Sequence, residues 1–228
     1  MKKSRITALI LSAVLCSGCI AGCGKKKDSS SKATEISVEE YAGTGEIVYP
    51  DEDSEEYDLG PYRVSENGVK LYFDEAEYPA ELMDALEKYF SSYETGDFDL
   101  YMEYIFPSYA ETMEKKLQEE YQYGLDKSFQ TQCDNLSVTG GENFEITRIK
   151  IEPPIEVESE EVAMDEFLDH LNEYFGFDYK STVKEESDKL YYMTFSVMAK
   201  TAEGNETLIV SSYYILFAEK DGRFYTFG

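Results

Sequence analysis

Cysteine and histidine are rare in this chain, whereas carboxylates and tyrosines are abundant. Its 228 residues include four cysteines and one histidine, against 47 Asp and Glu and 20 Tyr, and there is no tryptophan. Cys16, Cys19 and Cys23 lie close together near the N-terminus, whereas Cys133 stands alone. A thiol can act as a nucleophile, a metal ligand or an attachment point, and a carboxylate beside a tyrosine can transfer protons. Which chemistry is available depends on the elements that position these groups.

Cys133 and His170 are poorly placed for chemistry of their own. The body of the chain cannot form an internal disulfide, because Cys133 has no partner there. No activating base is evident near it, so we expect a buried structural thiol. On an expected helix over residues 160–175, His170 lies at the flank of the apolar stripe, toward the surface. We therefore predict no histidine-based dyad, no catalytic residue of this kind, no metal site and no cofactor.

The N-terminal residues combine a cationic start with a short apolar run. Three cations among the first five residues precede an apolar run over residues 6–15. That run is far shorter than the roughly 20 residues that a membrane-spanning helix needs. A branched residue and two small residues, Ile20-Ala21-Gly22, then precede Cys23. This pattern resembles the signal peptide of bacterial lipoproteins. The resemblance implies cleavage before Cys23 by a dedicated peptidase and attachment of lipid to its thiol.

Cys23 fits this pattern better than the two cysteines before it. Cys16 follows two bulky residues, and Cys19 has Cys16 where the family has Leu or Ile. The alternative is an ordinary signal peptide cut at a small-residue site, such as the one after Gly22, which would release a soluble protein. Two or three acyl chains such as palmitate would anchor firmly, because each buried methylene contributes about 0.8 kcal/mol. We predict a lipoprotein held through Cys23 at the extracytoplasmic face of the cell membrane.

The chain is strongly acidic. Its formal net charge is -26, and the residues after position 22 keep 18 of the 21 Lys and Arg against all 47 Asp and Glu, a net charge of -29. Binding to nucleic acid or to an anionic lipid surface needs clustered Lys and Arg. We therefore expect no nucleic-acid partner. Apart from the membrane, which the lipid on Cys23 would contact, the expected partner is an unidentified envelope protein or small ligand.

The sequence predicts three parts along the chain. Residues 1–22 form the lipoprotein signal peptide. Residues 23–61 contain no sustained apolar period and include an acidic run over residues 51–58, a composition typical of a disordered tether. That run lacks the loop spacing of a calcium site. Residues 62–228 remain as a single domain, long enough to bury a core.

This domain is expected to begin with helices and to end with strands. Asn67-Gly68 between two β-prone runs indicates a hairpin, Ser108 and Glu111 form a capping-box pattern, and broken alternation indicates a β-bulge near Thr147. The expected helices span residues 79–95, 97–106, 108–121, 125–133 and 160–175. After the hairpin at residues 62–73, the expected strands span residues 144–151, 181–201, 207–219 and 223–227. This order predicts an α+β fold with helices across one face of a sheet.

Residues 85–101 and Pro107 resemble the opening of NTF2-like domains. The matching stretch reads ALEKYFSSYETGDFDLY. That family begins with an amphipathic helix, a Gly-Asp turn and a second helix, and wraps a curved antiparallel sheet around them to make a cone with an internal pocket. The resemblance extends from about Tyr78 to residue 228 and implies that fold here. The hairpin and the third helix depart from the minimal pattern, and the family includes both enzymes and non-catalytic modules, so the fold alone does not decide the function.

Tyrosines are the candidate pocket residues. They are Tyr89, Tyr93, Tyr101, Tyr104, Tyr192 and Tyr213. These side chains either line a pocket for an apolar or sugar-like ligand or form core with their hydroxyls at the rim. Among the acids, Asp84, Asp97 and Asp99 lie near the elements that carry proton-transfer chemistry in the family, but nothing in the sequence singles one out.

We therefore expect a membrane-anchored lipoprotein that acts in non-catalytic ligand or protein binding at the cell envelope. The alternative is a small-molecule enzyme of the NTF2-like superfamily, of isomerase, dehydratase or hydrolase type, that uses a buried carboxylate and a tyrosine. A deep cone with a desolvated Asp or Glu beside a tyrosine would favour the enzyme, and a cone filled by Phe and Leu would favour a binding or structural module. A third possibility is a component of an export or sporulation assembly.

Overall fold

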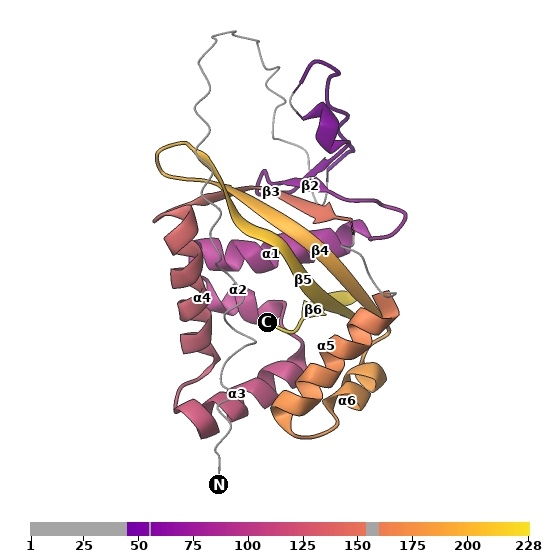
Figure 1. The fold of residues 1–228 in the computed structure, drawn as a ribbon, viewed down its shortest axis with the longest axis vertical. Helices are drawn as coiled ribbons and strands as arrows, with labels where there is room; N and C mark the ends of the chain where they lie inside the picture. The colour runs from indigo at the N-terminus through magenta and orange to yellow at the C-terminus, as the bar shows by residue number, and fades with distance from the viewer. Residues whose placement is uncertain (1–44, 55, 154–159) are drawn as a thin grey trace. The chain divides into compact units, whose positions relative to one another are not determined.

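The computed structural model describes residues 45–54, 56–153 and 160–228. In these ranges the chain forms six α-helices and a curled six-stranded sheet that makes a half-barrel (Figure 1). None of the described helices is long and apolar enough to span a bilayer. The predicted signal peptide, Cys23 and the first part of the predicted tether lie outside the described residues.

The helices occur mainly in the first part of the fold and the longest strands in the last part. The helices are α1 (Ala80–Thr95), α2 (Phe98–Glu103), α3 (Pro107–Tyr121), α4 (Leu125–Gly140), α5 (Glu160–Phe175) and α6 (Tyr179–Glu186). The strands are β1 (Arg63–Val64), β2 (Lys70–Tyr72), β3 (Glu145–Glu152), β4 (Lys189–Lys200), β5 (Glu206–Lys220) and β6 (Arg223–Thr226). This arrangement confirms the predicted α+β class.

The sheet is mixed, which corrects the prediction of an antiparallel sheet. Its strands follow sequence order from β1 to β6, and each neighbouring pair is antiparallel except β2 and β3, which are parallel. Parallel neighbours need a long crossover connection. Helices α1 to α4 all lie between β2 and β3 in the sequence, and they provide that connection.

Irregular pairing accompanies the curl of the sheet. The β3–β4 register shifts between Ile146 and Arg148, which confirms the predicted bulge near Thr147. The β4–β5 register shifts twice around Val197, and Ser212 of β5 has a φ of +48°. Bulges bend a strand and increase its twist, so long strands can curve around a core.

The start of the domain follows the sequence signals closely. β1 and β2 pair as a hairpin, with Gly68 at a φ of +83° in the turn. Helix α1 ends at Gly96, which adopts the left-handed conformation at a φ of +67°. The Asp97 side chain then accepts a hydrogen bond from the Leu100 N–H at 3.0 Å and caps α2. The predicted hairpin and first helix are confirmed. The second helix is also present, but it ends at Glu103, short of the predicted end at residue 106.

Two predictions in the third and fourth helices were wrong in detail. Helix α3 begins at Pro107, and its N-cap residue Phe106 makes no side-chain capping bond, so Ser108 and Glu111 do not form the predicted capping box. The Ser108 hydroxyl lies inside the first turn, 3.0 Å from the Tyr179 hydroxyl. Proline is well suited to the first helical position, which explains the earlier start. Helix α4 continues to Gly140, beyond the predicted end at residue 133.

Residues 179–186 form helix α6, although the sequence analysis predicts a strand from residue 181. The Asp178 side chain caps this helix by accepting bonds from the Ser181 N–H and hydroxyl at 3.2 and 2.6 Å. Tyr179 and Val183, one helical turn apart, are both buried. Capping and this four-residue spacing outweigh the β propensity of the segment.

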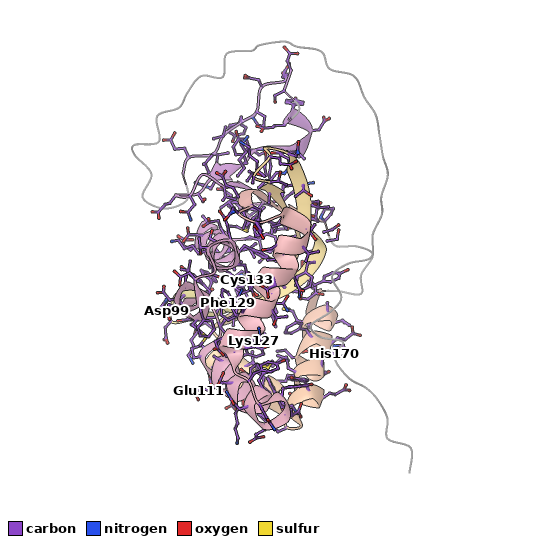
Figure 2. The ribbon with its side chains drawn as sticks, turned by 90° about the vertical axis from the view of Figure 1, so that its left-hand side faces the viewer. Asp99, Glu111, Lys127, Phe129, Cys133 and His170 are labelled. Atoms are coloured by element: carbon purple, nitrogen blue, oxygen red, sulfur yellow. The ribbon has the colours of Figure 1, made fainter. Side chains whose placement is uncertain are left out.

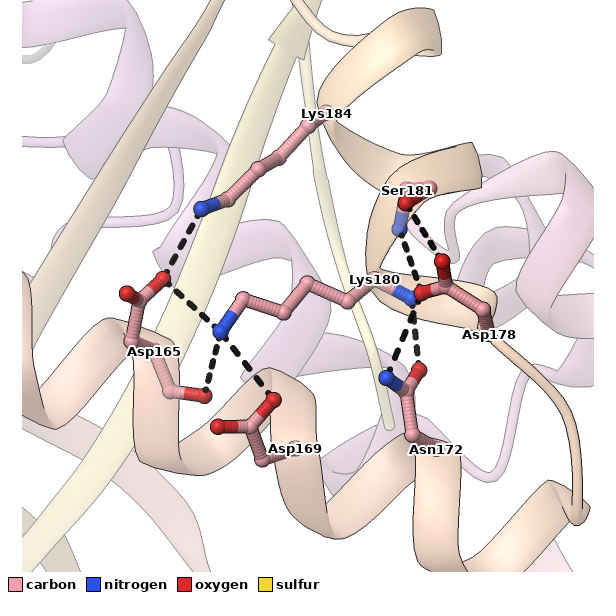
Figure 3. A network of polar contacts seen from close by, with 7 residues as sticks. All are labelled: Asp165, Asp169, Asn172, Asp178, Lys180, Ser181 and Lys184. Carbon is pink, nitrogen blue, oxygen red and sulfur yellow. Dashed lines mark hydrogen bonds and ion pairs between the residues drawn. The ribbon is translucent and has the colours of Figure 1, made fainter.

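Side chains of α5 hold α6 in place (Figure 3). The Lys180 ammonium lies 3.0 Å from the Asp169 carboxylate and 3.2 Å from that of Asp165, and Lys184 lies 2.9 Å from Asp165. The Lys180 N–H donates to the Asn172 side-chain oxygen at 2.7 Å. The hydrogen bonds to Lys184 and then Lys180 lower the pKa of Asp165. The strand predicted from residue 181 therefore begins only at Lys189.

The segment before the hairpin packs beside it. Val48 exchanges backbone hydrogen bonds with Tyr62 at 2.8 and 3.0 Å, and the Gly45 N–H donates to the Val64 carbonyl at 3.2 Å. Glu56 forms an ion pair with Lys70 of β2. These contacts are made by residues on the N-terminal side of the predicted domain boundary at Tyr62.

Candidate functional site

Three of the six candidate tyrosines meet in the interior, between the helices. Tyr89, Tyr93 and Tyr101 are all buried. The hydroxyls of Tyr89 and Tyr93 are 2.7 Å apart and hydrogen-bonded. The rings of Tyr89 and Tyr101 have centroids 5.8 Å apart, and those of Tyr93 and Tyr101 5.6 Å. Burial raises the pKa of each of the three phenols, so they stay neutral at physiological pH.

Aromatic side chains occupy the space around these tyrosines. Phe129 of α4 stacks on Tyr93 with a centroid distance of 5.2 Å and lies 4.9 Å from the Tyr101 ring (Figure 2). Phe90 lies 5.3 Å from the Tyr89 ring and 5.2 Å from Phe195 of β4. Pairs at these separations are in direct ring contact. The region in which a cone pocket is expected is therefore packed with aromatic core.

The other three candidate tyrosines do not join this group as an enclosed site. Tyr213 faces Phe195 at 6.1 Å and is 36% exposed, although it lies close enough to Tyr89 to raise the pKa of that phenol. Tyr192 stacks on Tyr214 with a centroid distance of 5.7 Å, and burial raises its pKa to about 12. Tyr104 is half-buried at the end of α2. The structure thus divides the predicted set between core and surface.

The candidate carboxylates do not reach the interior tyrosines. Asp84 forms an ion pair with Lys88 at 2.9 Å, Asp97 is the cap of α2, and Asp99 is exposed (Figure 2). The buried acid of α1 is instead Glu87, which is only 1% exposed and which the sequence analysis does not single out. Its position two residues before Tyr89 places it on the opposite side of the helix.

Glu87 contacts the hairpin. One carboxylate oxygen accepts hydrogen bonds from the Asn67 amide and the Ser91 hydroxyl, each at 2.9 Å. The other oxygen is buried and has no hydrogen-bond partner among the described residues. Burial raises the pKa of this carboxyl, and the bonds from Asn67 and Ser91 oppose that rise in part. This arrangement fixes the hairpin turn onto α1.

An open cleft of about 630 Å³ lies on the outside of the fold, at the hairpin. Three parts of the chain form it: the segment before and into β1, the end of β2 with the turn that leads to α1, and the end of β3 with the first residue of α5. Its walls combine tyrosines, carboxylates and apolar side chains. The lining residues include Tyr49, Tyr62, Tyr72, Tyr78, Asp74, Glu75, Glu77, Glu152, Glu160, Leu59, Phe73 and Ile151.

Carboxylates outnumber cations in this cleft. Among the described lining residues, five are carboxylates and two, Arg63 and Lys150, are cations. Arg63 pairs with Glu75 at 2.6 Å, and Lys150 pairs with Glu152 at 3.2 Å. Both cations are therefore already neutralised by neighbours in the wall, and the cleft keeps an excess of negative charge.

Two tyrosines of the cleft have unusual surroundings. Burial, together with the nearby charges of Glu160 and Glu77, raises the pKa of Tyr78 to about 12. Tyr72 is 2% exposed, burial likewise raises its pKa to about 12, and its hydroxyl has no hydrogen-bond partner among the described residues. A buried polar group without a partner is uncommon and marks a position for functional study.

No protein-family model, curated protein or solved structure matches the chain. The chemistry of the site must therefore be inferred from its own geometry.

Thiol, imidazole and metal chemistry have little geometric support in the described part of the chain. Cys133 is buried on α4, and burial raises the pKa of its thiol to about 11, so the reactive thiolate is scarce at neutral pH (Figure 2). His170 is exposed on α5. No three Cys, His, Asp or Glu side chains among the described residues are grouped to hold a metal ion.

The cleft was not predictable from the sequence because its walls are distant from one another along the chain. The described lining residues lie at 47–49, 59–63, 71–78, 150–153 and 160, and most of the first two groups fall in the predicted tether. Three tyrosines among residues 49–62 were the available signal, because aromatic residues are depleted in disordered segments.

Proposed function

We propose that this chain is a lipid-anchored extracytoplasmic lipoprotein whose NTF2-like domain binds a ligand without catalysing a reaction. The observation that carries the proposal is the contrast between a filled interior and the open cleft of about 630 Å³ at the hairpin. Clefts of roughly 300–1,000 Å³ with aromatic and apolar walls and a few polar groups are typical of small-molecule sites. The binding site is thus the outer cleft, and the tyrosine interior is core.

The arrangement of buried polar groups supports binding over catalysis. An enzyme of the alternative type needs a desolvated carboxylate beside a tyrosine hydroxyl within hydrogen-bond reach. Among the described residues, the buried Glu87 contacts Asn67 and Ser91 instead. The hydroxyls of Tyr89 and Tyr93 bond to each other. Neither contact places a carboxylate beside a tyrosine hydroxyl, which is the pair that the alternative enzyme would need.

The anchoring part of the proposal is tested by replacing Cys23. We expect the wild-type protein to remain with the membranes during fractionation of cells, and Cys23→Ala to lose the lipid and pass into the soluble extracytoplasmic fraction. A Cys19→Ala variant is the matched control and is expected to fractionate as the wild type does. Unchanged membrane retention of Cys23→Ala would contradict the lipid anchor.

The binding part is tested on the full chain extracted from its native membranes in mild detergent. Native mass spectrometry is expected to show a bound small molecule that is lost in Ile47→Trp, because a large ring at this cleft position fills the space. Val138→Trp is the matched control, since Val138 is exposed on α4 and lies outside the cleft. Retention of the bound molecule in Ile47→Trp, or its loss in both variants, would contradict the assignment of the cleft.

A further inference from the structure

We infer that the cleft at the hairpin binds an organic cation, with an ammonium or guanidinium group carried on a short apolar chain. This inference rests on the proposed function, because it assumes that the cleft is a binding site, and it adds the chemical class of the ligand.

The walls of the cleft carry unpaired negative charge. Three of the five carboxylates among the described lining residues, Asp74, Glu77 and Glu160, form no ion pair with a cation of the described residues, whereas Arg63 and Lys150 are each paired within the cleft. Two of these carboxylates, Glu77 and Glu160, lie close enough to Tyr78 to raise the pKa of its hydroxyl. They therefore converge on one place in the wall although they come from the turn before α1 and from the start of α5. An anionic ligand would be repelled there, and a cation would be attracted.

The cleft also presents aromatic surface. Tyr62 lines the cleft, and its ring already has the Lys70 ammonium 5.1 Å from its centroid and the Tyr72 ring at 5.0 Å. The electron-rich faces of aromatic rings attract ammonium and guanidinium groups within about 6 Å. Tyr49 and Tyr78 add two further rings to the same walls. Rings and carboxylates together are the groups expected around an organic cation.

Tyr72 contributes its ring to the wall, but its hydroxyl does not contact the ligand. This side chain lines the cleft and is 2% exposed, and its hydroxyl oxygen is buried without a hydrogen-bond partner among the described residues. The charged groups that shift its pKa are Glu56, Arg148 and Glu206, and none of them lines the cleft. The groups that carry the inference are therefore the carboxylates and rings that do face the cleft.

The apolar side chains that line the cleft indicate the non-polar part of the ligand. Leu59, Phe73 and Ile151 lie among the polar groups of the cleft. An inorganic cation would gain nothing from these side chains, whereas a chain of methylene groups would bury apolar surface against them. A short alkyl amine or alkyl guanidine therefore fits the walls better than a metal ion does.

The experiment is a calorimetric titration of the full chain in detergent micelles at fixed ionic strength. Three probes share a five-carbon chain and differ only in their ends: cadaverine carries ammonium groups, 1,5-pentanediol hydroxyls and glutarate carboxylates. Agmatine adds a guanidinium arm. We expect cadaverine or agmatine to bind at one site, and the diol and glutarate to show no binding. The stronger of the two cations identifies which cationic group the cleft prefers.

Charge-neutralising variants locate the binding. The double variant Glu77→Gln/Glu160→Gln is expected to weaken cation binding roughly tenfold or more, since charge-assisted hydrogen bonds are lost. The matched control is Glu111→Gln/Glu173→Gln, which removes the same charge at exposed positions outside the cleft. Both double variants remove two negative charges, so any non-specific attraction of cations to the protein would weaken equally in both. Circular dichroism establishes that each variant is folded.

The outcomes separate this inference from the proposed function. Equal weakening in the two double variants, no cation binding, or equal binding of cadaverine and the diol would overturn the cation assignment. If a neutral or anionic molecule is then found on the native protein and is displaced by Ile47→Trp, the cleft remains a binding site and only the ligand class is wrong. If Ile47→Trp has no effect on any bound molecule, the proposed function fails as well.

Discussion

The interior and the outer cleft are both rich in tyrosine, but the two regions differ in what surrounds the hydroxyls. In the interior, Tyr89 and Tyr93 bond to each other and their rings contact other aromatic rings. In the cleft, Tyr78 lies near two carboxylates and Tyr72 has no hydrogen-bond partner among the described residues. Hydroxyls that bond to each other stabilise a core, whereas the carboxylates near Tyr78 form no ion pair among the described residues and are the groups that the proposed ligand would contact. The neighbours of a tyrosine, rather than its presence, indicate its role.

The largest expected effect is a difference in how far one substitution in each region lowers the free energy of unfolding. Phe129→Ala removes a ring that contacts Tyr93 and Tyr101 in the interior, and we expect it to lower the free energy of unfolding by about 3–5 kcal/mol. Tyr49→Ala at the cleft is expected to change it by about 0.5 kcal/mol or less, because Tyr49 is 74% exposed. Urea unfolding measures both. Similar losses would mean that the cleft is part of the core.

The next effect compares single hydroxyls. Tyr89→Phe removes one partner of the 2.7 Å bond to Tyr93, and we expect a loss of about 1 kcal/mol in the free energy of unfolding. Tyr72→Phe removes a hydroxyl with no partner among the described residues, so we expect no loss or a small gain. The same urea experiment applies. A loss in Tyr72→Phe as large as that in Tyr89→Phe would show that the Tyr72 hydroxyl is bonded in the free protein.

A smaller effect tests how the hairpin wall of the cleft is held. Burial raises the pKa of Glu87 above its ordinary value in the unfolded chain. Its stabilisation is therefore complete below the unfolded-chain pKa and is lost as the pH rises through the raised folded-state pKa. Gln does not ionise, so Glu87→Gln is expected to lack this pH-dependent loss. The free energy of unfolding of Glu87→Gln, relative to that of wild type, should therefore increase as the pH rises above about 4.5. Urea unfolding between pH 4 and 8 measures the difference, and a constant difference would contradict the prediction.

The smallest effect compares Asp165, a carboxylate that holds a helix in place, with Glu160, a carboxylate assigned to the ligand. Asp165 pairs with Lys180 and Lys184, and its lowered pKa means that this contribution is lost as the pH falls through the folded-state value. We expect Asp165→Asn to increase hydrogen exchange in α6. Glu160→Gln should leave exchange unchanged throughout the domain, because Glu160 forms no ion pair among the described residues. Faster exchange near the cleft in Glu160→Gln would indicate a structural role.

Local signals in the sequence were sufficient for much of the fold. Asn67-Gly68, Gly96 and Asp97 act through their own backbone conformation or through the adjacent turn, and each occurs where it was expected. The parallel pairing of β2 with β3 was not predictable in this way, because it depends on how four intervening helices pack. Helix α6 was missed because its cap and its contacts with α5 outweigh local β propensity.

The site was less predictable than the fold. The periodicity of Tyr89 and Tyr93 indicated a buried face, but periodicity does not reveal whether rings line a space or fill one. The cleft depends on residues about 80 positions apart, such as Glu77 and Glu160, whose charges both act on Tyr78. Cys23 and its lipid remain predictions from the N-terminal pattern, since they lie outside the described residues.

The most direct test of the central claim is a crystal structure of the protein purified with its lipid from native membranes and soaked with cadaverine. We predict electron density for the probe in the cleft, between Tyr62, Tyr78 and Glu160, with the interior aromatic rings in contact as before. Density for a bound molecule among Tyr89, Tyr93 and Tyr101, with those rings moved apart and the outer cleft empty, would contradict the account.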